Sequence, residues 1–155
     1  MSSNITKNNF METARIIDKL SRTFPEYIRY GLEKLEILDV SGIQAMIIYR
    51  VGDKTITVGE VMRGGYYQGS NSSYNLRRLI ENGYLEKGNN TFDGRSSLVC
   101  LTDKGITLWN LLDSVIIPQV NKLTSKVIND KNITEITNNL HKIDSALRVN
   151  KISKS

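Results

Sequence analysis

The sequence predicts a mainly helical fold with one small antiparallel β-hairpin, an arrangement of the α+β class. Apolar residues recur at helical spacing at both ends of the chain, and the middle holds two short helices followed by two β-prone runs. At 155 residues the chain can bury one core of ordinary size. We therefore expect one compact unit assembled from three segments, residues 1–38, 39–104 and 105–155.

The first segment predicts a long amphipathic helix over residues 10–38. Small or apolar residues alternate by threes and fours from Phe10 through Ile17 to Leu35. Pro25 lacks an amide hydrogen and restricts the residue before it, so we expect a kink there or two helices that meet.

The last segment repeats the helical pattern twice between residues 103 and 150. Its two apolar stripes consist of Ile106, Trp109, Leu112, Ile116, Val120, Leu123 and Val127, and of Ile133, Ile136, Leu140, Ile143 and Leu147. The terminal helices carry more apolar surface than the central segment can cover. A second copy of the chain would cover it, so the pattern predicts a homodimer held by the N- and C-terminal helices. An intramolecular helical layer is the alternative.

The central segment begins with two short helices. Ser41 is a suitable N-cap for a helix that closes at Gly52. The β-prone run 54–57 leads into a second helix, 58–62, with Val58, Val61 and Met62 on one side. The pair Gly64-Gly65 then permits a tight turn.

A third helix follows, within GSNSSYNLRRLIENGYLEKG, residues 69–88. At 100° per residue, Ser72, Leu76, Leu79 and Ile80 share an inner arc. The outer side carries Ser70, Asn71, Tyr74, Arg77, Arg78 and Glu81. Two short helices joined by a glycine turn, the second exposing these side chains, are typical of a helix-turn-helix whose second helix enters the DNA major groove. An ordinary solvated helix face is the alternative.

A β-hairpin comes next. Gly83 ends the helix, and strands over 84–87 and 95–102 flank the polar loop 88–94. A hairpin directly after a recognition helix is a wing. Lys87 and Arg95 flank its loop, where a cation suits the negative potential of a narrow minor groove. The predicted fold is thus a winged helix-turn-helix between N- and C-terminal dimerisation helices, and an ordinary surface hairpin is the alternative for the wing.

Composition agrees with a polyanionic partner but does not establish one. The formal net charge is +5, and no apolar run approaches the roughly 18 residues of a membrane span. The first ten residues lack the features of a secretory signal, so we expect a cytoplasmic protein without membrane attachment. Cys100 is the only cysteine and cannot form an internal disulfide.

Residues 69–88, followed by DGRSSLVCLTDKG at 93–105, resemble the MarR family of bacterial winged-helix regulators. Within that family, residues 63–79 look most similar to the alphaproteobacterial LdtR-like branch, which implies control of cell-wall L,D-transpeptidase or stress genes. The resemblance implies that Ser70, Asn71, Tyr74, Arg77 and Arg78 face the major groove and that Arg95 serves the wing. It also implies that Asp93 orients Arg95 through a charged hydrogen bond. The family often has basic residues where this chain has Tyr74 and Gly94.

The same resemblance implies control by a small aromatic effector or by oxidation of a cysteine. Tyr30, Met46 and Met62 are candidates for lining an effector site, with ordinary core as the alternative. Cys100 follows Arg95 and precedes Lys104 in sequence, which could lower its pKa; a half-buried structural thiol is the alternative.

An enzyme is the main alternative from another class, and the sequence gives it little support. His141 is the only histidine and has no cysteine or second histidine at metal-ligand spacing, and no phosphate-binding glycine motif occurs. We expect no catalytic residue, no metal and no cofactor. The sequence therefore predicts a sequence-specific transcription regulator that binds a pseudo-palindromic duplex DNA operator as a homodimer. A winged-helix module that binds protein or RNA is the remaining alternative.

Overall fold

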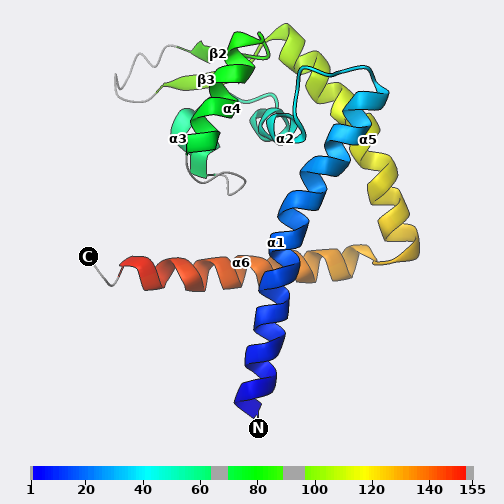
Figure 1. The fold of residues 1–155 in the computed structure, drawn as a ribbon, viewed down its shortest axis with the longest axis vertical. Helices are drawn as coiled ribbons and strands as arrows, with labels where there is room; N and C mark the ends of the chain where they lie inside the picture. Colours follow the sequence, from blue (N-terminus) through cyan, green and yellow to red (C-terminus); the bar gives the residue numbers. More distant parts are fainter. Residues whose placement is uncertain (1, 64–69, 89–96, 153–155) are drawn as a thin grey trace. The chain divides into compact units, whose positions relative to one another are not determined.

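A computed structural model describes residues 2–63, 70–88 and 97–152. Over these residues the chain forms six helices and three strands, in the order shown in Figure 1. The helices are α1 (Ser2–Lys34), α2 (Gly42–Val51), α3 (Val58–Arg63), α4 (Ser70–Glu81), α5 (Asp103–Lys126) and α6 (Asp130–Ile152). The strands are β1 (Ile56–Thr57), β2 (Leu85–Gly88) and β3 (Leu98–Leu101). The predicted mainly helical class with a small antiparallel sheet is confirmed.

The sheet has three antiparallel strands in the order β1-β3-β2. Strands β2 and β3 form the predicted hairpin, with Leu85 opposite Leu101 and Lys87 opposite Val99. The pairing of β1 with the other edge of β3, which places Ile56 opposite Val99, was not predicted. A strand of two residues is too short for its alternation to identify a sheet partner.

Helix α1 passes through Pro25 as one helix, so the break into two helices is wrong. A proline inside a helix removes one backbone hydrogen bond, and packing can outweigh that loss. Here the start of α2 packs closely on the proline: a Cβ on Gly42 would lie 1.8 Å from the Pro25 carbonyl oxygen. Only glycine allows this approach of α2 to α1.

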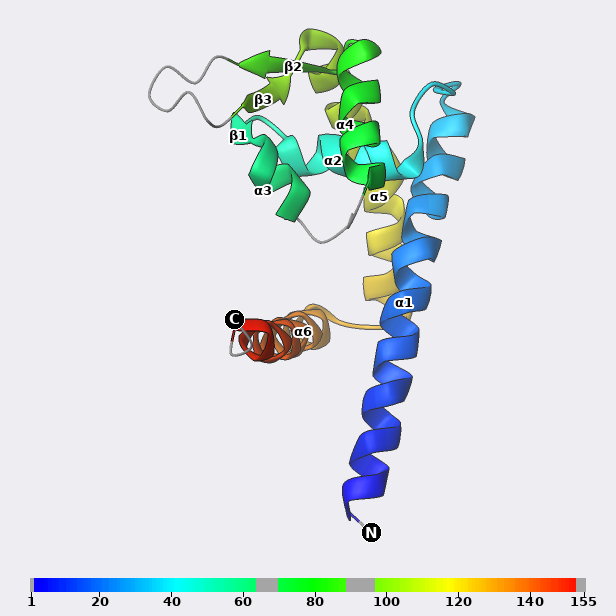
Figure 2. The ribbon, with the colours of Figure 1, turned by 60° about the vertical axis from the view of Figure 1, so that its left-hand side comes forward.

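Helix α2 lies between α1 on one side and α3 and α4 on the other (Figure 2). Its N-cap is Ser41, as predicted: the Gln44 amide donates to Ser41 Oγ at 3.2 Å, and the Ser41 amide donates to Gln44 Oε1 at 2.9 Å. Gly52 ends the helix with a φ of 55°, which glycine adopts without strain. The buried side chains of α2 make it the centre of this core: Ala45, Met46, Ile47, Ile48 and Val51.

Helix α4 leads into the sheet through Gly83. This residue has a φ of 75°, and its amide donates to the Ile80 carbonyl at 3.0 Å. The turn brings Leu85 into the sheet, where it is fully buried with Val99, while Leu79 of α4 is fully buried as well. Burial of these three side chains attaches α4 firmly to the rest of the core.

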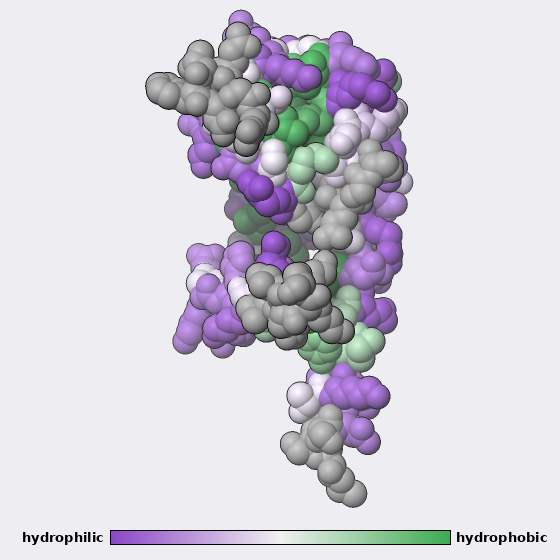
Figure 3. Space-filling model, turned by 90° about the vertical axis from the view of Figure 1, so that its left-hand side faces the viewer, coloured by the Kyte–Doolittle hydropathy of each residue, from purple (hydrophilic) through white to green (hydrophobic). Residues whose placement is uncertain are grey.

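The chain divides into two compact units, Met1–Val115 and Ile116–Ser155, and α5 begins in the first and ends in the second. In the second unit, apolar side chains of α5 and α6 are exposed: Ile117, Val120, Leu123, Val127, Ile133, Ile136, Leu140 and Leu147. In the first unit, α1 exposes Phe10, Met11, Ile16, Ile17, Leu20 and Phe24. Figure 3 shows hydrophobic surface on the part of α1 that runs down to the N-terminus.

Within the described ranges, no helix contains a stretch both long and apolar enough to cross a membrane.

Candidate nucleic-acid interface

Helix α4 presents a polar face to solvent. Asn71, Tyr74, Arg77 and Arg78 are all exposed on it, and the Tyr74 side chain is 51% exposed. Ser70 is the first residue of α4, and its side chain lies outside the described ones. The four described side chains therefore have the exposure that the prediction requires, while their contact with DNA stays a prediction.

The opposite face of α4 is buried in the core. Ser72, Leu76 and Leu79 are buried as predicted, and Ile80 is half-buried. The prediction missed Asn75, which is only 8% exposed and accepts a hydrogen bond from Gln44 Nε2 at 3.2 Å. The spacing of three and four residues from Ser72 through Asn75 to Leu79 is the signal that could have placed it on this face.

Both exposed arginines lie beside one carboxylate. Arg77 Nε is 3.7 Å and Arg78 Nη1 is 3.3 Å from the carboxylate of Glu81, and the Arg77 guanidinium lies 6.0 Å from the centroid of the Tyr74 ring. Exposed ion pairs of this kind contribute about 1 kcal/mol or less. The arginines can therefore leave Glu81 for a stronger anionic or hydrogen-bonding partner at little cost.

Helix α3 is held at its start by a reciprocal cap that the sequence prediction missed. The Glu60 amide donates to Thr57 Oγ1 at 3.1 Å, and the Thr57 amide donates to Glu60 Oε2 at 2.7 Å. The hydrogen bonds from the Thr57 amide and hydroxyl, followed by the nearby Arg63 and Arg50, hold the pKa of Glu60 below its ordinary value. The T-x-x-E spacing in the sequence is the signal for this cap.

A groove of about 740 Å³ lies among α3, α4 and the sheet. Its lining includes Arg63 from α3, Ser73 from α4 and Lys87 from β2, all three exposed. The structure thus brings Lys87 to the same groove as α4, and it adds Arg63 and Ser73 to the candidates. Asp93 and Arg95 lie outside the described residues.

The three candidate effector residues occupy different environments. Tyr30 is 59% exposed, with the Arg29 guanidinium 4.7 Å from its ring centroid, whereas Met46 is buried in α2 and Met62 is half-buried. Their role in an effector site stays a prediction. No group of three or more metal-ligand side chains occurs among the residues that the structure describes.

The Cys100 thiol lies beside a carboxylate. Its Sγ donates to Glu86 Oε1 at 3.6 Å, and burial together with the negative charge of Glu86 raises the pKa of the thiol. The sequence had raised the opposite possibility, that basic neighbours would lower this pKa. A raised pKa disfavours the thiolate, which is the reactive form.

Comparison with known proteins shows what this chain is similar to. Residues 40–105 match the winged helix DNA-binding domain family. The exopolysaccharide II synthesis transcriptional activator ExpG of Rhizobium meliloti is 35% identical over 96 residues, which are 62% of this chain and 50% of that protein. The chain thus spans half the length of that relative.

Solved structures share the fold over most of the chain. The transcriptional regulator BldR from Sulfolobus solfataricus is 20% identical with a TM-score of 0.72, over 90% of this chain and 96% of BldR. A cysteine-to-serine variant of MarR from E. coli, complexed with operator DNA, is 20% identical with a TM-score of 0.66, over 88% and 96% of the two chains. This chain is a winged-helix protein with N- and C-terminal helices. Its fold is shared with the solved MarR and BldR regulators, and its winged-helix region matches a DNA-binding domain family.

Proposed function

We propose that this chain binds a specific sequence of double-stranded DNA as a homodimer and thereby regulates transcription. The observation that carries the proposal is the exposed face of α4, which presents Asn71, Tyr74, Arg77 and Arg78 within a winged-helix framework. An α-helix fits the major groove, where arginine can donate two hydrogen bonds to guanine and asparagine can pair with adenine. Ser70, also on α4, would add a phosphate contact.

The groove beside α4 supports contacts to the DNA backbone. Arg63 and Lys87 supply positive charge there, and Ser73 supplies a hydroxyl donor. Such contacts fix the register of a recognition helix without specifying bases. In this proposal Arg95 reaches the minor groove from the wing, and Asp93 orients it.

The exposed apolar residues of α1, α5 and α6 support a homodimer. Two copies would read two half-sites about one helical turn apart, and the operator would be pseudo-palindromic. The MarR variant bound to operator DNA has the same fold, which agrees with this mode of action.

The genes under control and the effector belong to the finer part of the proposal. The LdtR-like resemblance predicts L,D-transpeptidase or stress genes as targets, whereas the relative described above activates exopolysaccharide II synthesis in its own organism. A small aromatic effector would bind preferentially to dimers with one spacing of the two winged helix-turn-helix regions, and this would shift the population of dimers that can bind DNA. Tyr30, Met46 and Met62 are the residues proposed to contact it.

The test is selection of duplexes from a random pool by the purified protein, followed by footprinting on DNA upstream of its own gene. We expect a pseudo-palindromic consensus and an affinity that falls steeply as salt rises, because phosphate contacts release counterions. A protein-binding module would select no consensus, and an RNA-binding module would prefer RNA to duplex DNA. Either result would exclude the proposed function.

A further inference from the structure

Helix α4 and the residue after it are hydrogen-bonded at two points to the start of α2 and the connection before it. Gln44 Nε2 donates to Asn75 Oδ1 at 3.2 Å, and Asn82 Nδ2 donates to the Asp39 carbonyl at 3.1 Å. Asn75 lies within α4 and Asn82 directly follows its last residue, about two helical turns further on and on nearly the same side. The segment from Asp39 to Gln44 therefore supports the C-terminal half of α4.

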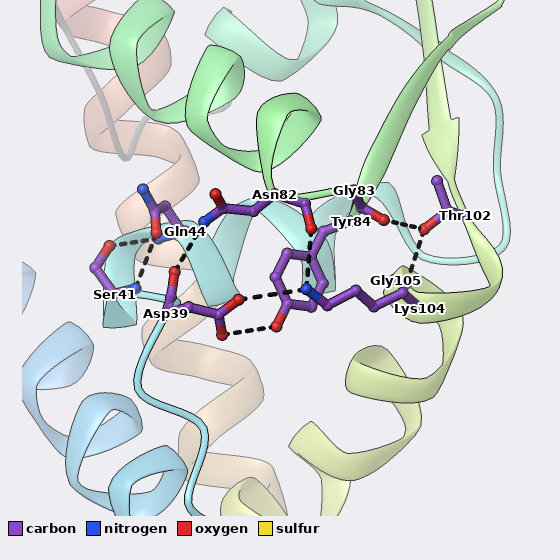
Figure 4. A network of polar contacts seen from close by, with 9 residues as sticks. All are labelled: Asp39, Ser41, Gln44, Asn82, Gly83, Tyr84, Thr102, Lys104 and Gly105. Carbon is purple, nitrogen blue, oxygen red and sulfur yellow. Dashed lines mark hydrogen bonds and ion pairs between the residues drawn. The ribbon is translucent and has the colours of Figure 1, made fainter.

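The carboxylate of Asp39 extends this support to the residues that follow α4 (Figure 4). The Tyr84 hydroxyl donates to Asp39 Oδ1 at 2.8 Å, and Lys104 Nζ lies 3.3 Å from Asp39 Oδ2. Lys104 Nζ also donates to the Asn82 carbonyl at 2.9 Å and lies 4.0 Å from the centroid of the Tyr84 ring. One carboxylate thus joins the α1–α2 connection, the end of α4 and the start of α5.

The hydrogen bond between the Tyr84 hydroxyl and the Asp39 carboxylate persists across the neutral pH range, because both groups keep the protonation states that it needs. Burial alone raises the pKa of Asp39, but the hydrogen bonds from Tyr84 and Lys104 outweigh it, so this pKa lies below its ordinary value. Burial, then the hydrogen bond to Asp39 and its charge, raises the pKa of Tyr84. Asp39 stays a carboxylate and Tyr84 stays a hydroxyl donor.

The start of α5 is bonded to the same turn. The Thr102 hydroxyl donates to the Gly83 carbonyl at 2.5 Å, and the Gly105 amide donates to Thr102 Oγ1 at 3.1 Å. A Cβ on Gly105 would lie 2.1 Å from the Tyr84 carbonyl oxygen, so glycine is needed for this approach. The turn after α4 cannot move away from α5 without breaking these contacts (Figure 4).

Apolar burial is not directional, so by itself it permits a helix to rotate slightly about its axis. Hydrogen bonds depend on angle and distance, and bonds at two levels of one face resist such rotation. We propose that these bonds, made by Asp39, Gln44 and Tyr84, set the rotation of α4 and thereby decide which bases its exposed side chains reach. The three are positioning residues, and the inference rests on the proposed function.

The test uses Tyr84→Phe, which removes one hydroxyl and leaves the ring in place. Its probes are the duplex that the unmodified protein selects from a random pool and a scrambled duplex of equal composition. We expect the affinity of the variant for the selected duplex to fall about fivefold or more, the lower range of typical coupling between sites. Affinity for the scrambled duplex should change less than about twofold, because phosphate contacts do not depend on base identity.

The matched control is Tyr49→Phe, which removes an exposed hydroxyl from α2 and should leave both affinities unchanged. A second selection, performed with Tyr84→Phe, should return a looser or altered consensus. If Tyr84 acted only on stability, the variant would have a smaller active fraction and would lose affinity for both duplexes equally. That result would overturn the inference, and so would an unchanged ratio of the two affinities together with an unchanged consensus. If the unmodified protein selected no consensus, the proposed function would fail first and this inference with it.

Discussion

At the scale of single residues, the side chains of α4 differ in how easily they can change partners. Arg77 and Arg78 pair only with Glu81 among the described residues, at the surface, where an ion pair contributes about 1 kcal/mol or less. Asn75 bonds to Gln44 in the core, where leaving one amide without a partner costs about 1–3 kcal/mol. The outer residues can exchange their protein partner for an external one, as the proposed contact with DNA requires, whereas the inner pair keeps the helix in place.

The first prediction concerns Arg78→Ala. A guanidinium that donates two hydrogen bonds to guanine contributes discrimination, so the free energy of binding to the selected duplex should weaken by about 1–3 kcal/mol. Fluorescence anisotropy with the selected and scrambled duplexes measures this change. Arg95→Ala, in the predicted wing, should weaken the binding of both duplexes more evenly.

The control for this variant is Arg148→Ala. Arg148 is an exposed arginine on α6 with a similar carboxylate partner, Asp144, at 2.8 Å. Arg148→Ala removes one positive charge, as Arg78→Ala does, but at a site outside the proposed interface. It should leave the ratio of the affinities for the selected and scrambled duplexes unchanged. If Arg78→Ala behaved like this control, the assigned reading face would be wrong.

The second prediction concerns the reactivity of Cys100. Because burial and Glu86 raise the pKa of its thiol, the thiolate fraction is low at neutral pH and increases only as pH rises toward that pKa. Iodoacetamide should therefore alkylate Cys100 more slowly than a small free thiol at about pH 8, with a rate that is still rising at higher pH.

Glu86→Gln should speed this alkylation, since it removes the negative charge beside Sγ, and mass spectrometry over time measures both rates. Glu135→Gln, an exposed site on α6, is the control and should leave the rate unchanged. Rapid alkylation of the unmodified protein, with a plateau already at neutral pH, would contradict this account and favour a redox role.

At the scale of elements, caps and glycines were the most predictable features. Ser41 was expected to begin α2, and Gly52 and Gly83 were expected to end helices; both glycines have positive φ. These signals are local, because the capping atoms and the dihedral angles belong to residues within one turn of each other. The amphipathic pattern of α4 was predictable for the same reason, and so was its exposed face.

Features that depend on contacts between distant segments could not be predicted in this way. The pairing of β1 with β3 joins residues far apart in sequence, and the close packing of Gly42 on Pro25 brings two helices together where a break had been expected. The burial of Asn75 likewise depends on Gln44, an amide on another helix. The groove was missed because its lining comes from α3, α4 and the sheet.

The third prediction tests the cap of α2. Ser41→Ala removes the acceptor for the Gln44 amide, so the free energy of unfolding should fall by about 0.5–2 kcal/mol. Urea denaturation measures this free energy, with both proteins at the same concentration because the stability of a dimer depends on concentration. Ser125→Ala removes an exposed hydroxyl that donates to the Lys122 carbonyl within α5, and it should change stability by about 0.5 kcal/mol or less. If both variants lowered the free energy of unfolding equally, the Ser41 cap would stabilise the fold no more than an ordinary exposed hydroxyl does.

At the scale of the whole molecule, each compact unit leaves apolar side chains in contact with solvent. In the first unit many of them lie on α1, and in the second they lie on α5 and α6. Single exposed apolar residues are common, but a repeated stripe on one helix is typical of a surface that a partner covers. On α6 the stripe recurs every three or four residues from Ile133 to Leu147.

The last prediction follows from that stripe. Ile136 is 47% exposed, and Ile136→Asp would place a charge in the proposed interface, where desolvation is costly. Sedimentation velocity at micromolar concentration should show a dimer for the unmodified protein and a shift toward monomer for the variant. Asn138→Asp adds the same charge to the polar side of α6 and should remain dimeric.

Because a monomer engages only one half-site, Ile136→Asp should also lose affinity for the full operator while keeping the same half-site preference. A monomer in the unmodified protein would exclude the homodimer, and with it the explanation of these exposed stripes.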